Sequence, residues 1–329
     1  MPIHILSHDD VHRCLPPRDC ADAMEQVLEA LARGELHSPL RSVVRPPGAA
    51  GLLGLMPAYR GGASPLYALK AVCIYPDNPA KHGIDAHQGG VLLYDGETGE
   101  LTAIVDGAAL TAVRTAAVTA VATKALARPG SSELAILGAG SQARAHLAAL
   151  ADVLPLTRVR VQSRTFAHAQ ALADEAGASY GFPIEAVETV ADALRGADVV
   201  VTVSTAREPI VGVEHLEPGM HVNLVGSSIS STREITGAGL ARTSLFVDRR
   251  ESTVNESGDY LMALAEGEID ESHIRAELGD VLAGLAEGRR SDDEITSFKS
   301  LGIAVEDLAA AELAVANAAA TGVGTVASW

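Results

Sequence analysis

The sequence predicts an α/β protein in which a doubly wound, parallel Rossmann sheet is joined to an α+β domain. Residues 133–137 form an apolar strand that leads directly into Gly138-x-Gly140-x-x-Ala143 and an Ala- and Leu-rich helix. Apolar strands and helical segments then alternate, as in parallel βαβ units. Before this region, short strands follow one another with turn residues between them, which favours an antiparallel sheet.

The composition fits two domains and small-molecule ligands. The chain has 329 residues, 47% of them hydrophobic, so it can build sizeable cores. Its formal net charge of −17 disfavours nucleic acid or an anionic membrane surface as a partner, because phosphates need a basic face. The start of the chain lacks the pattern of a signal peptide, and no stretch has the character of a membrane span.

Cysteine and histidine usage indicates the compartment and the absence of a metal. Three cysteines do not form a disulfide framework, so we expect a cytoplasmic protein. The four-residue spacing of His4, His8 and His12 crosses the predicted entry into a helix instead of marking one helix face. We therefore expect no metal site.

Residues 1–115 are predicted to form the α+β domain. An amphipathic helix is expected first, over residues 19–33, followed by strands at residues 40–44, 51–57, 67–75, 87–94 and 101–106. The stretch 95–99 has the composition of a glycine-containing hairpin loop. A helix over residues 108–127 then leads towards the nucleotide fold and is the expected hinge.

Residues 116–304 are predicted to form the Rossmann domain. Gly138 permits a tight turn, Gly140 lets the backbone approach a pyrophosphate, and Ala143 lets the helix pack closely. Ser141 and Gln142 open that helix, whose N-terminus would face the phosphates. Further strands are expected at residues 158–161, 197–203, 221–225 and 245–248. The C-terminal segment 305–329, an Ala-rich helix to about residue 320, is expected to rejoin the first domain.

The end of the second Rossmann strand indicates which cofactor is bound. Ser163, Arg164 and Thr165 follow this strand, with no acidic residue to accept a ribose 2′-hydroxyl. Because Arg164 and two hydroxyls can meet a 2′-phosphate, NADP(H) is the preferred cofactor, and NAD(H) is possible. The alternative is that Arg164 packs on the adenine or is solvated, in which case either cofactor serves.

Other candidate cofactor contacts follow later strands of the same sheet. Ser204 and Gly226 stand at the carboxyl ends of strands, where open α/β sheets bind ligands. The loop 225–234, which includes Ser228, should border the nicotinamide, or it is simply a solvated serine loop. Lys299 is a further candidate, with a solvated connection between domains as the alternative.

Three cations lie in apolar stretches. Lys70 shares a predicted strand face with apolar side chains, Arg41 stands beside Val43, and Arg114 has no acidic residue three or four positions away. Because burying an unpaired charge is costly, these side chains either reach water, pair with distant acids, or share an anionic ligand. Next to a nucleotide fold, we favour a carboxylate-binding cluster.

The chain resembles the ornithine cyclodeaminase/mu-crystallin family along almost its whole length. The matching stretches, in order, are residues 41–44, 55–59, Lys70, 87–89, 111–117, 138–143, 223–226, 256–259 and 296–302. The resemblance implies a homodimer that pairs its N-terminal sheets, with a Rossmann domain beside each. Family members include ornithine and lysine cyclodeaminases, alanine dehydrogenases, iminosuccinate reductases and reductases of cyclic ketimines.

The resemblance also implies roles for particular residues. Arg41, Lys70 and Arg114 would hold the substrate carboxylate. Cyclodeaminases of the family carry an aspartate where this chain has Ser228, and mu-crystallin-like ketimine reductases carry a serine. We therefore expect NAD(P)H-dependent reduction of a 2-imino acid to an L-amino acid, with Lys70, a water or His87 as proton donor.

Three other functions stay open at this point. An ornithine cyclodeaminase is the runner-up. An alanine dehydrogenase or iminosuccinate reductase type of activity is a second, and iminosuccinate would require a further cation, for which Arg45 is the nearby candidate. A protein that binds a ligand without turnover is the third.

Overall fold

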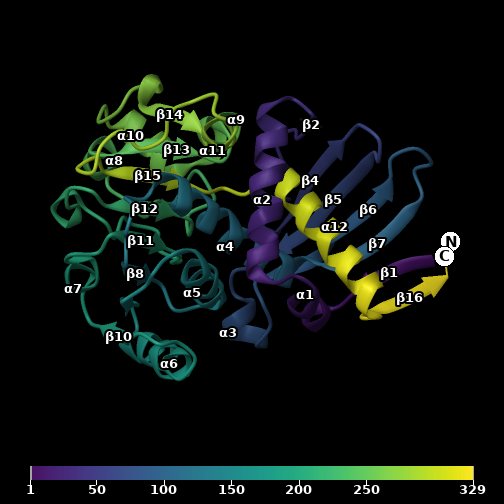
Figure 1. Ribbon diagram of the computed structural model, residues 1–329, viewed down its shortest axis with the longest axis horizontal. Coiled ribbons are helices and arrows are strands. Elements are labelled where there is room, and N and C mark those ends of the chain that lie inside the picture. The colour runs from purple at the N-terminus through teal and green to yellow at the C-terminus, as the bar shows by residue number, and fades with distance from the viewer. Residues whose placement is uncertain (1, 329) are drawn as a thin grey trace. The chain divides into compact units, whose positions relative to one another are not determined.

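The chain folds into two units. The computed structural model describes residues 2–328, except for the side chains of residues 79 and 80. Unit 1 comprises residues 1–117 and 302–329, and unit 2 comprises residues 118–301. The first boundary falls within α4 (Gly107–Leu126), and the second directly follows Leu301. Each unit is built on one sheet with helices packed on it (Figure 1).

Unit 1 contains a mixed eight-stranded sheet. The strand order is β16-β1-β7-β6-β5-β4-β2, with β3 also paired to β4. The β1–β7 pair is parallel and the other pairs are antiparallel. The strands are β1 (Pro2–Leu6), β2 (Leu36–His37), β3 (Ser42–Val44), β4 (Leu52–Arg60), β5 (Leu66–Ile74), β6 (His87–Asp95), β7 (Leu101–Asp106) and β16 (Thr325–Ser328).

Two long helices cover one face of this sheet. They are α12 (Ala304–Thr321), which lies over β4, β5 and β6, and α2 (Pro17–Ala32), which packs on α12 and on β2 (Figure 1). In α2, Cys20, Met24, Leu28 and Leu31 are buried, and their spacing places them on one helical stripe. The shorter helices of unit 1 are α1 (His8–Cys14) and α3 (Asn78–His82).

The C-terminal segment 305–329 contains a strand as well as the expected helix. The Ala-rich helix expected to about residue 320 is α12, which ends at Thr321 because Gly322 adopts a left-handed conformation with φ of 69°. Residues Thr325–Ser328 then form β16, which pairs with β1. The sequence did not predict this strand, so the segment is not helical throughout, and Trp329 lies outside the described residues.

Unit 2 contains a fully parallel eight-stranded sheet, which confirms the predicted doubly wound fold. Its order is β10-β9-β8-β11-β12-β15-β13-β14. The chain order reverses at β8, between β9 and β11, and such a point binds ligands beyond the carboxyl ends of the strands. The strands are β8 (Glu133–Leu137), β9 (Arg158–Gln162), β10 (Ile184–Val187), β11 (Val199–Thr202), β12 (His221–Leu224), β13 (Ser244–Val247), β14 (Ile274–Glu277) and β15 (Thr296–Lys299).

Helices connect and flank these parallel strands. They are α5 (Ser141–Val153), α6 (Phe166–Gly177), α7 (Val190–Leu194), α8 (Gly237–Ala241), α9 (Arg250–Glu256), α10 (Gly258–Ala265), α11 (Leu278–Leu282) and the 3-10 turns η1 (Val213–His215) and η2 (Glu271–His273). Among the described helices, α4 alone has the length and apolar composition of a membrane span. Its apolar window is 78% buried inside the protein, as in the core helix of a folded domain.

Candidate functional site

The loop after β8 has the backbone geometry of a dinucleotide cradle. Gly138 has φ of 131°, and its N–H donates to the carbonyl of Gln162 at 2.8 Å. A Cβ at Gly138 would lie 2.6 Å from the carbonyl oxygen of Val203. Only glycine fits at this point, where the carboxyl ends of β8, β9 and β11 meet.

The start of α5 fits a pyrophosphate. Gly140 is the N-cap of this helix, and a Cβ built there would fill open space, with no protein atom within 4 Å. Ala143 is fully buried, so the helix packs closely on the sheet. The side-chain oxygen of Gln142 is buried without a hydrogen-bond partner among the described residues. An open backbone at a helix N-terminus suits phosphate oxygens.

Three side chains follow β9 at the same edge of the sheet. Ser163 is half-buried, whereas Arg164 and Thr165 are exposed. Thr165 is the N-cap of α6 without a capping hydrogen bond from its side chain. The described contacts include no hydrogen bond or ion pair of the Arg164 guanidinium, so this group is available to a bound molecule.

Ser204, Gly226 and Lys299 are held by buried acids. Glu234 accepts from the backbone N–H and the hydroxyl of Ser204 at 2.9 and 2.6 Å, and from the N–H of Gly226 at 2.7 Å. The Lys299 ammonium donates to Asp259 at 2.8 Å and to the carbonyl of Ser227. These groups therefore shape the carboxyl edge of the sheet from inside.

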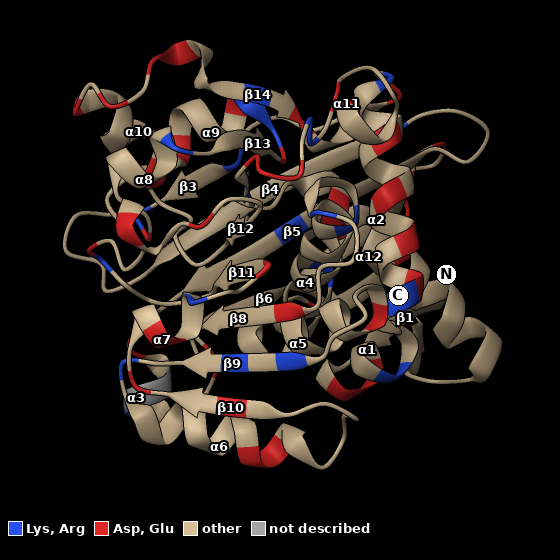
Figure 2. Cartoon of the chain, turned by 60° about the vertical axis from the view of Figure 1, so that its left-hand side comes forward, with Lys and Arg blue, Asp and Glu red and all other residues tan. Residues whose placement is uncertain are grey.

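Lys70 and Arg114 converge on two acids of α12. Lys70 Nζ lies 3.2 Å from Asp307 Oδ1, and Arg114 Nε lies 3.0 Å from the same oxygen. Arg114 Nη1 donates to Glu306 Oε2 at 2.9 Å. All four side chains are at least 95% buried. Figure 2 shows basic colour within β5, and Lys70 is the basic residue in the sequence of this strand. Of the three expected arrangements, pairing with distant acids holds for Lys70 and Arg114.

Arg41 joins the same cluster through Gly302. Its Nη2 donates to the carbonyl of Gly302 at 2.9 Å. Gly302 has φ of 74°, and a Cβ there would lie 2.6 Å from Arg114 Nη1. The glycine is required by both its backbone and the arginine packed against it. We call Arg41, Lys70, Arg114, Glu306 and Asp307 the cation cluster.

The electrostatics of the cation cluster favour an additional anion. Burial lowers the pKa of Lys70 to about 8. Asp307 raises this pKa and only partly offsets the desolvation, whereas the positive charges of Arg114 and Arg41 lower it further. Burial acts to raise the pKa of Asp307, but Lys70 and Arg114 bring it below its ordinary value. An anion beside Lys70 would offset the repulsion from Arg114 and Arg41 that lowers the pKa of its amine. Asp307 Oδ2 is buried with no hydrogen-bond partner among the described residues. The cluster can therefore accept both an anion and a hydrogen-bond donor.

His87 lies outside the cation cluster. It begins β6, and its Nδ1 is 3.4 Å from Asp85 Oδ1 with nearly half of the side chain exposed. Lys70 pairs with Val91, four residues further along β6, which corresponds to about 13 Å along the strand. Within unit 1, the candidate proton donor next to the cationic groups is Lys70.

Sequence reasoning missed the acids that complete these arrangements. Glu306 and Asp307 stand in the first turn of an Ala-rich helix, where acidic residues are ordinary because they oppose the helix dipole. Glu234 stands in a serine-rich loop without periodicity. The only signal in the sequence was that Glu306 and Asp307, an adjacent acidic pair, interrupt an otherwise apolar stretch. The sequence did not show that these two residues are buried.

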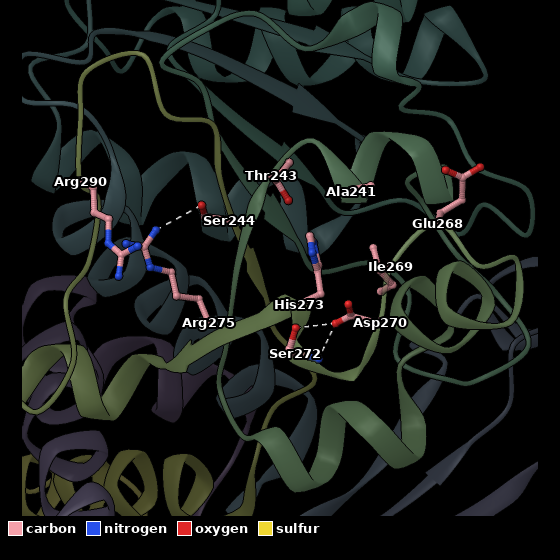
Figure 3. A pocket seen from close by; sticks show the side chains of 10 residues that line it. All are labelled: Ala241, Thr243, Ser244, Glu268, Ile269, Asp270, Ser272, His273, Arg275 and Arg290. Atoms are coloured by element: carbon pink, nitrogen blue, oxygen red, sulfur yellow. Dashed lines mark hydrogen bonds between the residues drawn. The ribbon is translucent and has the colours of Figure 1, made fainter.

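A polar cavity in unit 2 lies elsewhere. It has a volume of about 450 Å³ and is lined by Ala241, Thr243, Ser244, Glu268, Ile269, Asp270, Ser272, His273, Arg275 and Arg290 (Figure 3). Ser244 begins β13, so the cavity is at the amino edge of the parallel sheet, opposite the edge that carries Gly138. Arg275 donates to Ser244 and pairs with Glu294. No residue assigned to the site by sequence lines this cavity.

The described residues contain no group of three or more His, Cys, Asp or Glu side chains placed to hold a metal ion. All three cysteines are free: Cys14 and Cys20 are buried and Cys73 is half-buried. Burial raises the pKa of Cys20 to about 12, so this thiol is not a nucleophile.

The parallel sheet, with its glycine loop at the order reversal, defines a Rossmann dinucleotide-binding protein. The model of the ornithine cyclodeaminase/mu-crystallin family matches residues 3–322, and the chain belongs to this family. It is 40% identical over 280 residues to the ketimine reductase mu-crystallin of Rattus norvegicus, with 85% of each chain covered.

Two solved structures show the same architecture. One is Thermococcus litoralis Δ1-pyrroline-2-carboxylate reductase in complex with NADH and L-proline, with a TM-score of 0.94, 36% identity, and 98% of this chain and 99% of that chain covered. The other is an archaeal alanine dehydrogenase dimer with bound NAD, with a TM-score of 0.93, 30% identity and full coverage of both chains.

Proposed function

We propose that the protein is an NAD(P)H-dependent reductase that converts a 2-imino acid, in particular a cyclic ketimine, to the L-amino acid. The observation that carries this proposal is the cation cluster, in which Lys70 and Arg114 share one buried carboxylate whose second oxygen, Asp307 Oδ2, has no partner among the described residues. A 2-imino acid has a carboxylate and, when protonated, an adjacent N–H. The relatives named ketimine reductase and Δ1-pyrroline-2-carboxylate reductase support the same substrate class.

The residues of the cluster have distinct roles in this proposal. Arg41 and Arg114 bind the substrate carboxylate through charge-assisted hydrogen bonds. Lys70 contributes a third positive charge and holds a proton at Nζ that can pass to the imine nitrogen, since its lowered pKa of about 8 lies near neutral pH. A reduced nicotinamide held by the Gly138–Ala143 loop supplies the hydride.

Ser228 favours imine reduction over amine cyclisation. It is an exposed residue of the loop after β12, and its hydroxyl offers only a neutral hydrogen bond. A carboxylate there would stabilise an ammonium and accept its proton. Asp307 is the acid that contacts Lys70, but Lys70 and Arg114 both donate to its Oδ1. Its negative charge is therefore already paired with two cations.

The test compares substrates with purified protein. Δ1-pyrroline-2-carboxylate or Δ1-piperideine-2-carboxylate should consume NAD(P)H readily, whereas L-ornithine with NAD(P)⁺ should release little ammonia. Ser228→Asp should leave imine reduction unchanged or slow it, and could add weak ammonia release. Efficient conversion of ornithine to proline by the unmodified protein would overturn the proposal. Turnover confined to pyruvate with ammonia would favour an alanine dehydrogenase.

The cofactor form and the assembly are parts of the same proposal. Exposed Arg164, with Ser163 and Thr165, supports a preference for NADPH over NADH. We propose that unit 1 binds substrate and forms a homodimer, because its sheet carries the exposed apolar residues Val43, Val44 and Tyr67, and Tyr75 directly follows β5. Light scattering in solution tests the dimer.

Free cysteines support a cytoplasmic location, which fractionation of cells would test.

A further inference from the structure

Three charged residues of unit 2 form one fully buried network. Lys299, Asp259 and Glu234 come from the end of β15, the first turn of α10 and the loop before α8, and none is more than 1% exposed. Lys299 Nζ donates to Asp259 Oδ2, and Asp259 Oδ1 accepts from the backbone N–H groups of Glu234 and Ile235 at 2.7 and 3.2 Å. The lysine is thus linked through the aspartate to the backbone of the glutamate.

Glu234 holds the carboxyl ends of two neighbouring strands together. Its Oε2 accepts from the Thr202 hydroxyl at 2.6 Å and from the Gly226 N–H at 2.7 Å, while Oε1 accepts from both groups of Ser204. A Cβ at Gly226 would lie 2.4 Å from Glu234 Oε1, so the strand end approaches the carboxylate as closely as a glycine permits. The loops after β11 and β12 are therefore fixed to one side chain.

The network also fixes the residue immediately before Ser228. The Lys299 ammonium donates to the carbonyl of Ser227, and the Ser227 hydroxyl contacts Thr232 Oγ1 at 2.8 Å. Gly258 packs so closely on the loop that a Cβ there would meet the carbonyl oxygen of Ile229 at 2.8 Å. Ser228 itself is exposed, although both residues before it are held from inside.

We propose that Lys299, Asp259 and Glu234 are positioning residues that set the backbone of the Ser228 loop for imine reduction and contact neither cofactor nor substrate. The role in catalysis rests on the proposed function. The basis is geometric, because every side-chain nitrogen and oxygen of the three residues has a partner among the described residues. A buried network in which each polar side-chain atom has at least one partner inside the protein is suited to holding a loop.

Hydrogen exchange tests the network without reference to activity. In Lys299→Met and in the conservative Glu234→Gln, amides of residues 225–232 should exchange at least tenfold faster than in the wild type, while those of β8 and α5 stay unchanged. The matched control is Arg275→Met, which breaks another largely buried ion pair of the same sheet at its amino edge. Unchanged exchange at residues 225–232 in folded Glu234→Gln would overturn the proposal.

Kinetics then separate positioning from a structural role. Under conditions where circular dichroism shows folded protein, kcat with Δ1-pyrroline-2-carboxylate should fall at least tenfold in Glu234→Gln, while the Kd for NADPH measured by fluorescence changes less than threefold. Arg275→Met should keep the wild-type kcat. A kcat loss that matches Arg275→Met, or a tenfold weaker cofactor Kd, would contradict the assignment. Absence of turnover in the wild type would instead refute the proposed function. The exchange result would still show whether the three residues hold the Ser228 loop.

Discussion

The two units each bury a lysine with carboxylates, but only one of the two arrangements is complete. In unit 2, Lys299, Asp259 and Glu234 use all of their polar atoms within the protein. In unit 1, Asp307 leaves one oxygen without a partner among the described residues, although Lys70 and Arg114 both contact its other oxygen. Burying polar groups without partners is costly, so a protein keeps such a site where a ligand completes it. On this comparison, we expect the cation cluster of unit 1 to bind a ligand and the buried network of unit 2 to support a loop.

Stability should separate the two lysines most strongly. Lys299→Met leaves Asp259 buried without its cation, and such a change costs about 3–5 kcal/mol. Lys70→Met should cost about 1–2 kcal/mol, because Arg114 still pairs with Asp307 and the amine is already poorly solvated. Urea unfolding of both variants, followed separately for each transition, measures the difference. Equal losses would show that the two clusters are energetically alike.

Substrate affinity should depend on the cation cluster alone. Lys70→Ala should raise KM for the imino acid by about 10- to 150-fold, since a charged hydrogen bond contributes about 1.5–3 kcal/mol. NADPH affinity should be unchanged. Arg60→Ala is the matched control. Arg60 joins the neighbouring strand β4 to α12 through Glu312, as Lys70 joins β5 to α12, but Arg60 is partly exposed. Wild-type kinetics in Lys70→Ala would remove this lysine from the site.

The pH profile should report the charge of Lys70. With a pKa of about 8, the amine is cationic below this pH and neutral above it, so kcat/KM should fall about tenfold per pH unit above about pH 8. Asp307 raises this pKa, and Asp307→Asn should therefore move the falling limb to lower pH. Arg114 and Arg41, which lower it, remain in that variant. A limb that stays in place would exclude Lys70 as the titrating group.

The sequence predicted the elements better than the contacts between distant charges. Strands such as β8 and β11 were recognisable because buried parallel strands are nearly continuous apolar runs. The cations Lys70 and Arg114 were found because they interrupt apolar stretches of a strand and a helix. Their partners were not, since Asp307 lies 237 residues from Lys70 and only packing of α12 on β5 brings them together. The partner of Lys299 was also missed, because Asp259 lies 40 residues away on α10.

The smallest effect concerns the cofactor. Arg164→Ala should weaken kcat/KM with NADPH by about three- to tenfold and leave NADH nearly unaffected, because an exposed charge pair is worth about 1 kcal/mol. Steady-state assays with both cofactors at equal ionic strength measure the ratio. Better turnover with NADH in the wild type would reject the preference and leave the rest of the site unaltered.

The most direct measurement compares Δ1-pyrroline-2-carboxylate with Δ1-pyrroline, the same cyclic imine without the carboxylate. If Arg41, Lys70 and Arg114 form a carboxylate site, the loss of several charge-assisted hydrogen bonds should lower kcat/KM at least about hundredfold for the second substrate. Reduction of the two imines with equal kcat/KM would show that the cation cluster does not bind substrate.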